Sequence, residues 1–185
     1  MKIVLKIVLI FVILIFLGIL IISDIADRNQ YYSKYTPEEE LKIFMWKDGY
    51  DEYQDHRDVY KDHFNNEKYR FPRKKVSKVK LFKNSFLISR LTSTTISETN
   101  KISIIKFFNN PSNFDWSETT WDLSESEYIL RFYNQENKVI GKIWFCLQSC
   151  RMTESEPFSP SMKYGGLSKN GRKKLKTLID KILSE

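Results

Sequence analysis

The sequence predicts an α+β protein: an N-terminal transmembrane helix, then a small antiparallel sheet of about four strands covered by helices. An uninterrupted apolar run from Ile7 to Ile22 predicts the membrane helix, because about twenty helical residues span the hydrocarbon of a bilayer. Farther along, segments with alternating apolar residues occur in neighbouring pairs, which is typical of antiparallel hairpins. Other segments repeat apolar residues at helical spacing, so helices are expected to cover the sheet.

Length and composition limit the classes of protein. The 185 residues suit one domain plus an anchor. Charged residues are 29% and aromatic residues 15% of the chain, which excludes a wholly disordered protein. The net charge of +7 includes Lys2 and Lys6 beside the apolar run. The remaining excess is too small to predict nucleic-acid binding, which requires a strong positive field on one face.

Residues 1–23 are predicted to form a signal-anchor helix that stays in the membrane. The alternative is an exported protein whose signal peptide is removed. Cleavage after Ser23 would put Ile21 three places before the cut, and cleavage after Ala26 would put Asp24 there. Neither position has the small residue that a cleavage site needs, so retention is favoured.

The flanking charges do not decide the orientation of this helix. Lys2 and Lys6 on one side are balanced by Arg28 and Lys34 on the other. A very short basic tail before an apolar run is typical of an export signal, which predicts an extracytoplasmic domain. The alternative is reversed topology with a regulatory domain facing the cytoplasm.

The polar stretch 24–35 is predicted to be a juxtamembrane linker, and the stretch 36–70 a helical segment. Thr36 can cap the first helix there, with Pro37 at its first position. Residues 71–185 are predicted to form the α+β domain, and the segment 36–70 is expected to belong to the same folded unit.

A first hairpin and a helix are predicted early in this domain. Val79 and Leu81 alternate with lysines, and a second apolar run covers 86–91 after a polar turn. Apolar residues at helical spacing predict a helix over 98–109, which Pro111 terminates.

The clearest hairpin joins strands 128–133 and 139–147 through the turn-forming residues 134–137. One face of each strand lacks charge, whereas the other carries Arg131 or Lys142. We therefore expect removal of the Lys142 side chain to change stability little. The residues predicted to face the core are Leu130, Phe132, Ile143 and Phe145.

The last element is an amphipathic helix that Ser168 is expected to cap. Its apolar face should pack on the sheet, opposite a basic face. The apolar residues are Leu175, Leu178, Ile179, Ile182 and Leu183, and the basic residues are Arg172, Lys173, Lys174 and Lys176.

The two cysteines, Cys146 and Cys150, are candidates for a disulfide in an oxidising compartment. In a continuous strand their Cα atoms would be about 13 Å apart, so a bond requires a turn between them. The alternative is that Cys146 is an ordinary buried residue.

The segment 114–127 is acidic and aromatic, and Trp116, Glu118 and Trp121 are candidate ligand-binding residues. Rings beside paired carboxylates would suit a glycan-cleaving enzyme, in which one carboxyl protonates and the other attacks. A surface loop whose tryptophans pack on the core is the favoured interpretation.

Two further features could bind anions. A glycine turn from Tyr164 leads into a helix that carries Arg172, where free backbone N–H groups could hold phosphate; a tight turn capped by Ser168 is favoured instead. A basic run and the basic last helix could meet anionic lipid, a surface polyanion or an acidic protein partner, although a solvated strand edge gives the same pattern. The run consists of Lys68, Arg70, Arg73, Lys74, Lys75, Lys78, Lys80 and Lys83.

No catalytic, metal-binding or cofactor motif is predicted. His56 and His63, the two histidines, are seven residues apart, about 10 Å along a helix, which is too far for one zinc ion. The sequence therefore predicts a membrane-anchored, non-catalytic binding or interaction module of the cell envelope. The alternatives are a glycan-acting envelope enzyme and a cytoplasm-facing regulatory domain.

Overall fold

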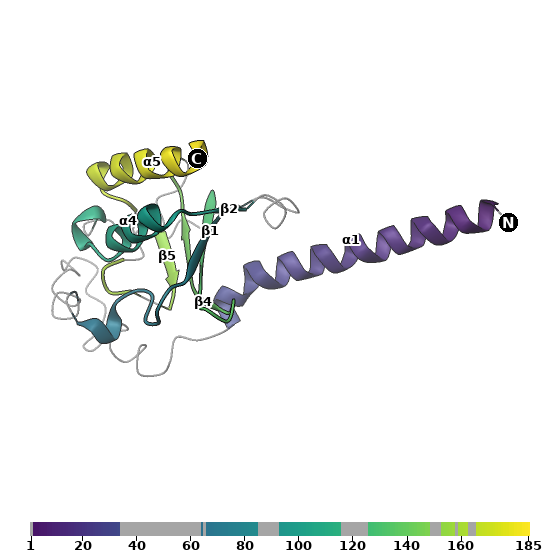
Figure 1. Cartoon of the computed structure of the whole chain (residues 1–185), viewed down its shortest axis with the longest axis horizontal. Coiled ribbons are helices and arrows are strands. Elements are labelled where there is room, and N and C mark those ends of the chain that lie inside the picture. The colour runs from purple at the N-terminus through teal and green to yellow at the C-terminus, as the bar shows by residue number, and fades with distance from the viewer. Residues whose placement is uncertain are drawn as a thin grey trace, which may run out of the picture.

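The computed structural model describes residues 2–33, 64, 66–84, 93–115, 126–148, 153–157, 159–162 and 166–185. Among them an N-terminal helix precedes a five-stranded antiparallel sheet with helices packed against it, which confirms the α+β prediction (Figure 1).

Helix α1 runs from Lys2 to Ser33 and projects away from the sheet (Figure 1). It is longer than the apolar segment and continues through most of the stretch expected to be a linker. The reason lies in the sequence, because no proline or glycine interrupts the chain between Gly18 and Ser33.

The sheet has the strand order β2-β1-β3-β4-β5, and every neighbouring pair is antiparallel. The central hairpin β3–β4 was predicted, whereas β2 and β5 were not. The run 86–91, expected to pair with β1, lies outside the described residues; in the structure Lys80 of β1 pairs with Thr95 of β2. The strands are β1 (Lys78–Lys83), β2 (Thr94–Thr95), β3 (Tyr128–Tyr133), β4 (Val139–Phe145) and β5 (Thr153–Glu156).

Two α-helices confirm the predicted positions. Ser168 caps α5 as expected, since its hydroxyl accepts a hydrogen bond from the Gly171 N–H at 3.0 Å. Most of the segment 36–70 lies outside the described residues. The helices are α4 (Glu98–Phe108) and α5 (Lys169–Ser184), with short 3-10 helices η1 (Glu67–Tyr69) and η2 (Pro111–Asn113).

The core lies between the sheet and the layer formed by α4 and α5, as Figure 1 shows from the side. The strand-face prediction is confirmed, because all four side chains expected in the core have no exposed surface. Helix α5 contributes Leu175, Ile179 and Ile182 to the same cluster, and α4 contributes Ile104 and Phe108.

Gly171 lets α5 approach η2 closely. A Cβ atom at this position would lie 2.0 Å from the Asn113 carbonyl oxygen. The same carbonyl accepts a hydrogen bond from the Ser168 N–H at 2.9 Å. The start of α5 is therefore fixed against η2 by backbone contacts.

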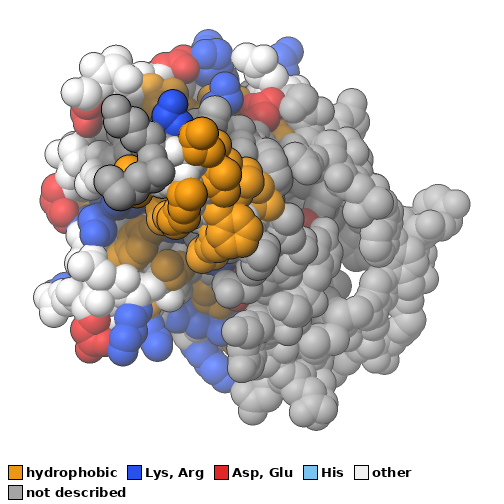
Figure 2. Space-filling view, turned by 90° about the vertical axis from the view of Figure 1, so that its right-hand side faces the viewer, with side chains coloured by type: hydrophobic (Ala, Val, Ile, Leu, Met, Phe, Trp, Pro, Cys, Tyr) orange, Lys and Arg blue, Asp and Glu red, His pale blue; other side chains and the backbone are white. Residues whose placement is uncertain are grey.

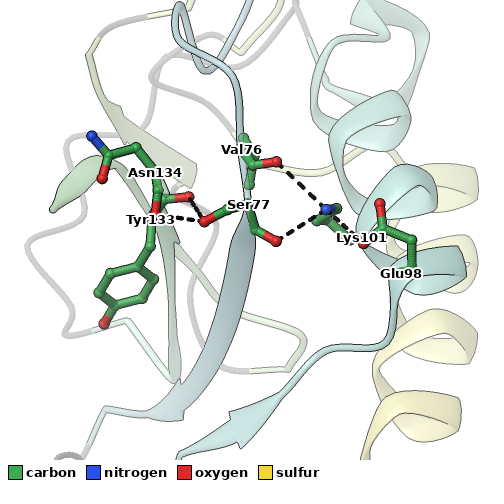
Figure 3. A network of polar contacts seen from close by, with 6 residues as sticks. All are labelled: Val76, Ser77, Glu98, Lys101, Tyr133 and Asn134. Atoms are coloured by element: carbon green, nitrogen blue, oxygen red, sulfur yellow. Dashed lines mark hydrogen bonds and ion pairs between the residues drawn. The ribbon is translucent and has the colours of Figure 1, made fainter. Parts of the chain in front are cut away.

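A buried lysine links α4 to β1 (Figure 3). The Lys101 ammonium donates to the Ser77 carbonyl at 3.1 Å, with a longer contact of 3.5 Å to the Val76 carbonyl. Glu98, one helical turn earlier, pairs with Lys101 at 2.7 Å. The Lys101 side chain is only 9% exposed, and both its charge and its N–H donors have partners inside the domain.

Ser77 connects this network to the central hairpin. Its hydroxyl donates to the Tyr133 carbonyl at 3.1 Å and also to the Asn134 carbonyl (Figure 3). The start of β1 is therefore joined to α4 on one side and to the β3–β4 turn on the other.

Candidate functional site

The first functional element is the apolar part of α1. Its span Ile3–Ile21 has 19 residues and a mean hydropathy of 3.3, and none of it is buried against the rest of the chain. Figure 2 views the molecule from the side to which α1 projects, where hydrophobic side chains stand out from the surface. The helix is long and apolar enough to span a membrane.

This exposure separates α1 from an ordinary core helix. A Leu, Ile, Val or Phe side chain left in water forgoes about 1.5 to 3 kcal/mol of burial free energy. A helix that exposes so many of them needs an apolar environment that the folded domain does not supply. A membrane-spanning anchor meets this requirement, and so does a signal sequence before cleavage.

Most of the site residues predicted from the sequence lie outside the described residues. Cys146 and Arg172 are the two that the structure describes. Those outside it are Trp116, Glu118, Trp121, Cys150 and Tyr164.

Cys146 follows directly after β4 and is 2% exposed. It is disulfide-bonded in the structure. Cys150 is the only other cysteine in the sequence, and its pairing with Cys146 stays a prediction.

One carboxylate of the acidic and aromatic segment has a structural role. The Glu127 side chain accepts hydrogen bonds from the backbone N–H groups of Leu147 at 2.8 Å and of Gln148 at 3.2 Å. Because Glu127 holds the chain just after β4, its oxygens are engaged by backbone donors. The candidate residues of this segment, Trp116, Glu118 and Trp121, lie outside the described residues.

The glycine turn before α5, whose less favoured interpretation is an anion seat, is described only from Gly166 onward. The Gly166 carbonyl accepts a hydrogen bond from the Asp115 N–H at 2.9 Å, and Leu167 forms an antiparallel bridge with Phe114. Arg172, half-buried, stands just beyond this junction. Gly166 and Leu167 thus join the start of α5 to the chain around η2.

The sheet face opposite the helices carries two rows of side chains, and the sequence had already placed Arg131 and Lys142 on this face. In one row Phe82, Ile129 and Trp144 are cross-strand neighbours and form a second buried cluster. In the adjacent row Lys80, Arg131 and Lys142 are cross-strand neighbours, and Lys142 is followed by Glu156 on β5.

Two of the three cations in this row, Arg131 and Lys142, lie over rings of the same sheet face. The Arg131 guanidinium is 4.4 Å from the Phe82 ring centroid, and the Lys142 ammonium is 5.8 Å from that of Trp144. Like charges on adjacent strands repel, and these rings offset part of that repulsion. The arrangement shows how a row of cations is accommodated on a largely buried face.

The structure corrects the expectation that Lys142 is dispensable. Its side chain is 8% exposed, and its ammonium lies 4.0 Å from the Glu156 carboxylate. Lys142 does lie on the face away from the helices, as the sequence indicated. That face is itself buried at this position.

Helix α5 presents its basic residues to solvent. Its carboxylates are engaged, because Asp180 pairs with Lys176 at 2.6 Å and Glu185, just after the helix, accepts from Asn100 at 2.8 Å. Four lysines are exposed and have no ion-pair partner among the described residues: Lys169, Lys173, Lys174 and Lys181.

The position of Lys169 is unfavourable for the helix itself. Lys169 stands in the first turn, which contains no acidic residue, and Lys173 and Lys174 follow in the second turn. A cation in the first turn opposes the macrodipole, typically by about 0.3 to 1 kcal/mol. Helix stability therefore does not account for this concentration of charge.

The second basic surface, formed by η1 and the loop that follows it and called the basic loop below, is partly engaged within the domain. Lys68 and Arg73 lie 5.5 and 5.9 Å from the Tyr69 ring centroid. Partial burial lowers the pKa of the Arg73 guanidinium, although the group stays charged at physiological pH. Lys74 and Lys75 are exposed.

The described residues contain no group of three or more His, Cys, Asp or Glu side chains that could hold a metal ion. His56 and His63 lie outside these residues.

No protein-family model, no curated protein and no solved structure matches this chain.

Proposed function

We propose that this chain is a single-pass membrane protein whose α+β domain lies outside the cytoplasm and acts as a non-catalytic binding or interaction module of the cell envelope. The observation that carries the proposal is α1, whose span Ile3–Ile21 is 0% buried within the chain. Such a helix tethers the domain to a bilayer, so the domain meets its partners at the membrane surface.

The disulfide of Cys146 supports the extracytoplasmic orientation. Disulfides persist in oxidising compartments and are rare in the cytosol. The short basic tail before the apolar run points the same way.

Two charged side chains of the described domain have structural roles. Glu127 is held by backbone N–H groups, and Lys101 bridges α4 and β1. Both side chains hold the fold together, as buried polar groups with satisfied hydrogen bonds do.

Membrane fractionation tests the anchor. The full chain with a C-terminal tag should stay in the membrane pellet after alkaline carbonate washing and keep its full mass. Replacing Ile10 and Leu14 by lysine should release it, because each lysine at the centre of a membrane helix costs about 2.5 to 3.5 kcal/mol. The matched control exchanges the two residues for each other, Ile10→Leu with Leu14→Ile, and should remain in the pellet. A soluble product lacking residues 1–23 would identify a signal peptide instead.

Thiol labelling tests the orientation. With two cysteines in the chain, an extracytoplasmic domain should take up no maleimide until it is denatured and reduced, and then two. Labelling of both thiols in denatured but unreduced protein would indicate a reducing compartment. Reporter fusions at the C-terminus should agree with the labelling result.

A further inference from the structure

Helix α5 carries a basic surface that neither the fold nor the membrane helix requires. We name it the α5 basic face and define it by Lys169, Lys173, Lys174 and Lys181. The opposite side of the helix is fully occupied by the core, where Leu175 and Ile179 have no exposed surface. The lysines therefore point away from the domain.

The charge of this face is uncompensated. The helix holds six basic residues and one acidic residue, Asp180, which is paired with Lys176 at 2.6 Å. The lysines of the α5 basic face remain without ion-pair partners among the described residues. Concentrated cations on a rigid helix suit a surface that carries many anions at once.

We propose that the α5 basic face docks on the anionic phospholipid headgroups of the membrane that holds α1. This inference rests on the membrane anchor of the proposed function and not on its orientation, because the tether supplies the occupant. Thirty residues separate Ser33 from Phe64, and a fully extended chain of that length reaches about 100 Å. A domain of this size has a radius of gyration of roughly 13 Å, so α5 lies within reach of the bilayer.

Tethering to the membrane favours phospholipid headgroups over other anionic ligands of the α5 basic face. A domain linked to a bilayer meets its headgroups at high effective concentration, so contacts that would be weak in solution become populated. Every basic residue near an anionic surface adds attraction that decays within a Debye length. A soluble polyanion or an acidic protein lacks this advantage.

The face also differs from the basic loop. In the basic loop, Lys68 and Arg73 make cation–π contacts with the Tyr69 ring. The α5 lysines have no such ring contact among the described residues. We therefore expect α5, and not the loop, to face the bilayer.

The test uses the full chain in nanodiscs of phosphatidylcholine alone or of phosphatidylcholine and phosphatidylglycerol at two to one. Lysines are acetylated with a membrane-impermeant ester and quantified by mass spectrometry. Lys169, Lys173 and Lys174 should react about fivefold more slowly in the anionic discs, and high salt should abolish the difference. Lys138, at the β3–β4 turn with its side chain 75% exposed, is the internal control and should not change.

Matched variants show which face docks. Replacing Lys169, Lys173 and Lys174 by glutamine should abolish the protection of Lys181 in anionic discs. Replacing Lys68, Lys74 and Lys75 by glutamine removes the same charge from the loop and should leave that protection intact. Near-ultraviolet circular dichroism verifies that both variants keep the native fold.

Several outcomes would overturn the assignment. Equal acetylation of α5 in both discs would do so, as would protection of Lys74 and Lys75 that equals or exceeds that of α5. Protection by soluble inorganic polyphosphate in zwitterionic discs, without protection by anionic discs, would assign the face to a free polyanion. Failure of the chain to co-elute with zwitterionic discs would remove the anchor and this inference with it. Co-elution with unchanged lysine rates would overturn the α5 assignment alone.

Discussion

The side-chain amide of Asn109 pairs with the backbone of Phe71 as a neighbouring strand would. Its oxygen accepts from the Phe71 N–H at 2.8 Å, and its nitrogen donates to the Phe71 carbonyl and to the Ile105 carbonyl. Phe71 itself is 1% exposed and meets Phe132 edge to face at 5.0 Å between centroids. One amide at the end of α4 thus fixes an irregular segment onto the core.

Asn109→Ala should destabilise the domain by about 2 to 3 kcal/mol, because it leaves a partly buried N–H and two carbonyls without their partner. Urea denaturation of the full chain in detergent micelles, followed by tryptophan fluorescence, measures the loss. Asn170→Ala, at an exposed position of α5, is the matched control and should stay within about 0.5 kcal/mol of the parent. Equal effects of the two substitutions would show that the Asn109 bonds contribute little.

Gly171→Ala should lower stability although alanine is the better helix former. In an unconstrained helix this change adds about 1 kcal/mol of stability. Here the new methyl would lie 2.0 Å from the Asn113 carbonyl oxygen, which belongs to the backbone and can move only with η2. We expect a net loss of about 2 kcal/mol or more in the same denaturation assay.

Gly18→Ala is the control for this change, because a Cβ atom added at this position of α1 would have nothing within 4 Å. It should leave the unfolding midpoint of the domain unchanged. A Gly171→Ala protein as stable as Gly18→Ala would show that α5 is not held this close to η2.

Substitutions on either face of β4 should lower the free energy of unfolding, but by different mechanisms. Ile143→Ala should lose about 2 to 5 kcal/mol, as cavity-forming changes in a core do. Lys142→Ala should lose about 1 to 2 kcal/mol, because the buried aliphatic stem and the Glu156 pairing disappear together. Lys142→Met keeps the stem and isolates the contribution of the charge.

Lys138→Ala provides the exposed reference for this series and should change stability by less than about 0.5 kcal/mol. If Lys142→Ala matched Lys138→Ala, the burial of the second sheet face would not contribute to folding.

Lys101→Ala should detach the start of β1 from α4 and cost about 1 to 3 kcal/mol, since the Ser77 carbonyl loses its ammonium partner. Lys106→Ala, an exposed lysine of the same helix, is the control. Hydrogen exchange should show faster exchange around Ser77 in Lys101→Ala than in Lys106→Ala. Identical exchange in both proteins would contradict the linking role of Lys101.

Elements governed by local chemistry were predictable from the sequence. The β3–β4 turn is one, because the Asn134 side chain accepts from the N–H groups of Glu136 at 3.0 Å and of Lys138 at 2.9 Å. The start of α5 is another, since a serine cap acts within a single helical turn. In both cases the residues that decide the structure are adjacent in the chain.

Elements that depend on distant partners were not predictable. Strand β5 buries Thr153 and Ser155, so its inward face shows no apolar alternation, and β2 is two residues long. The burial of Lys142 follows from its pairing with Glu156 on that unexpected strand. The candidate binding residues Trp116 and Trp121 are not described, and their role stays a prediction.

The outermost described strands also limit how copies of this protein can associate. Under the proposed function the chains share a membrane plane and collide often, and an open sheet edge would allow them to pair into aggregates. Strand β2 offers only two residues at one edge. At the other, β5 alternates Glu154 and Glu156 with its buried hydroxyl residues and ends before Pro157, which has no amide hydrogen to donate. Among the described residues, the short length of β2 on one side and Pro157 at the end of β5 on the other limit the edge that a neighbour's strand could extend.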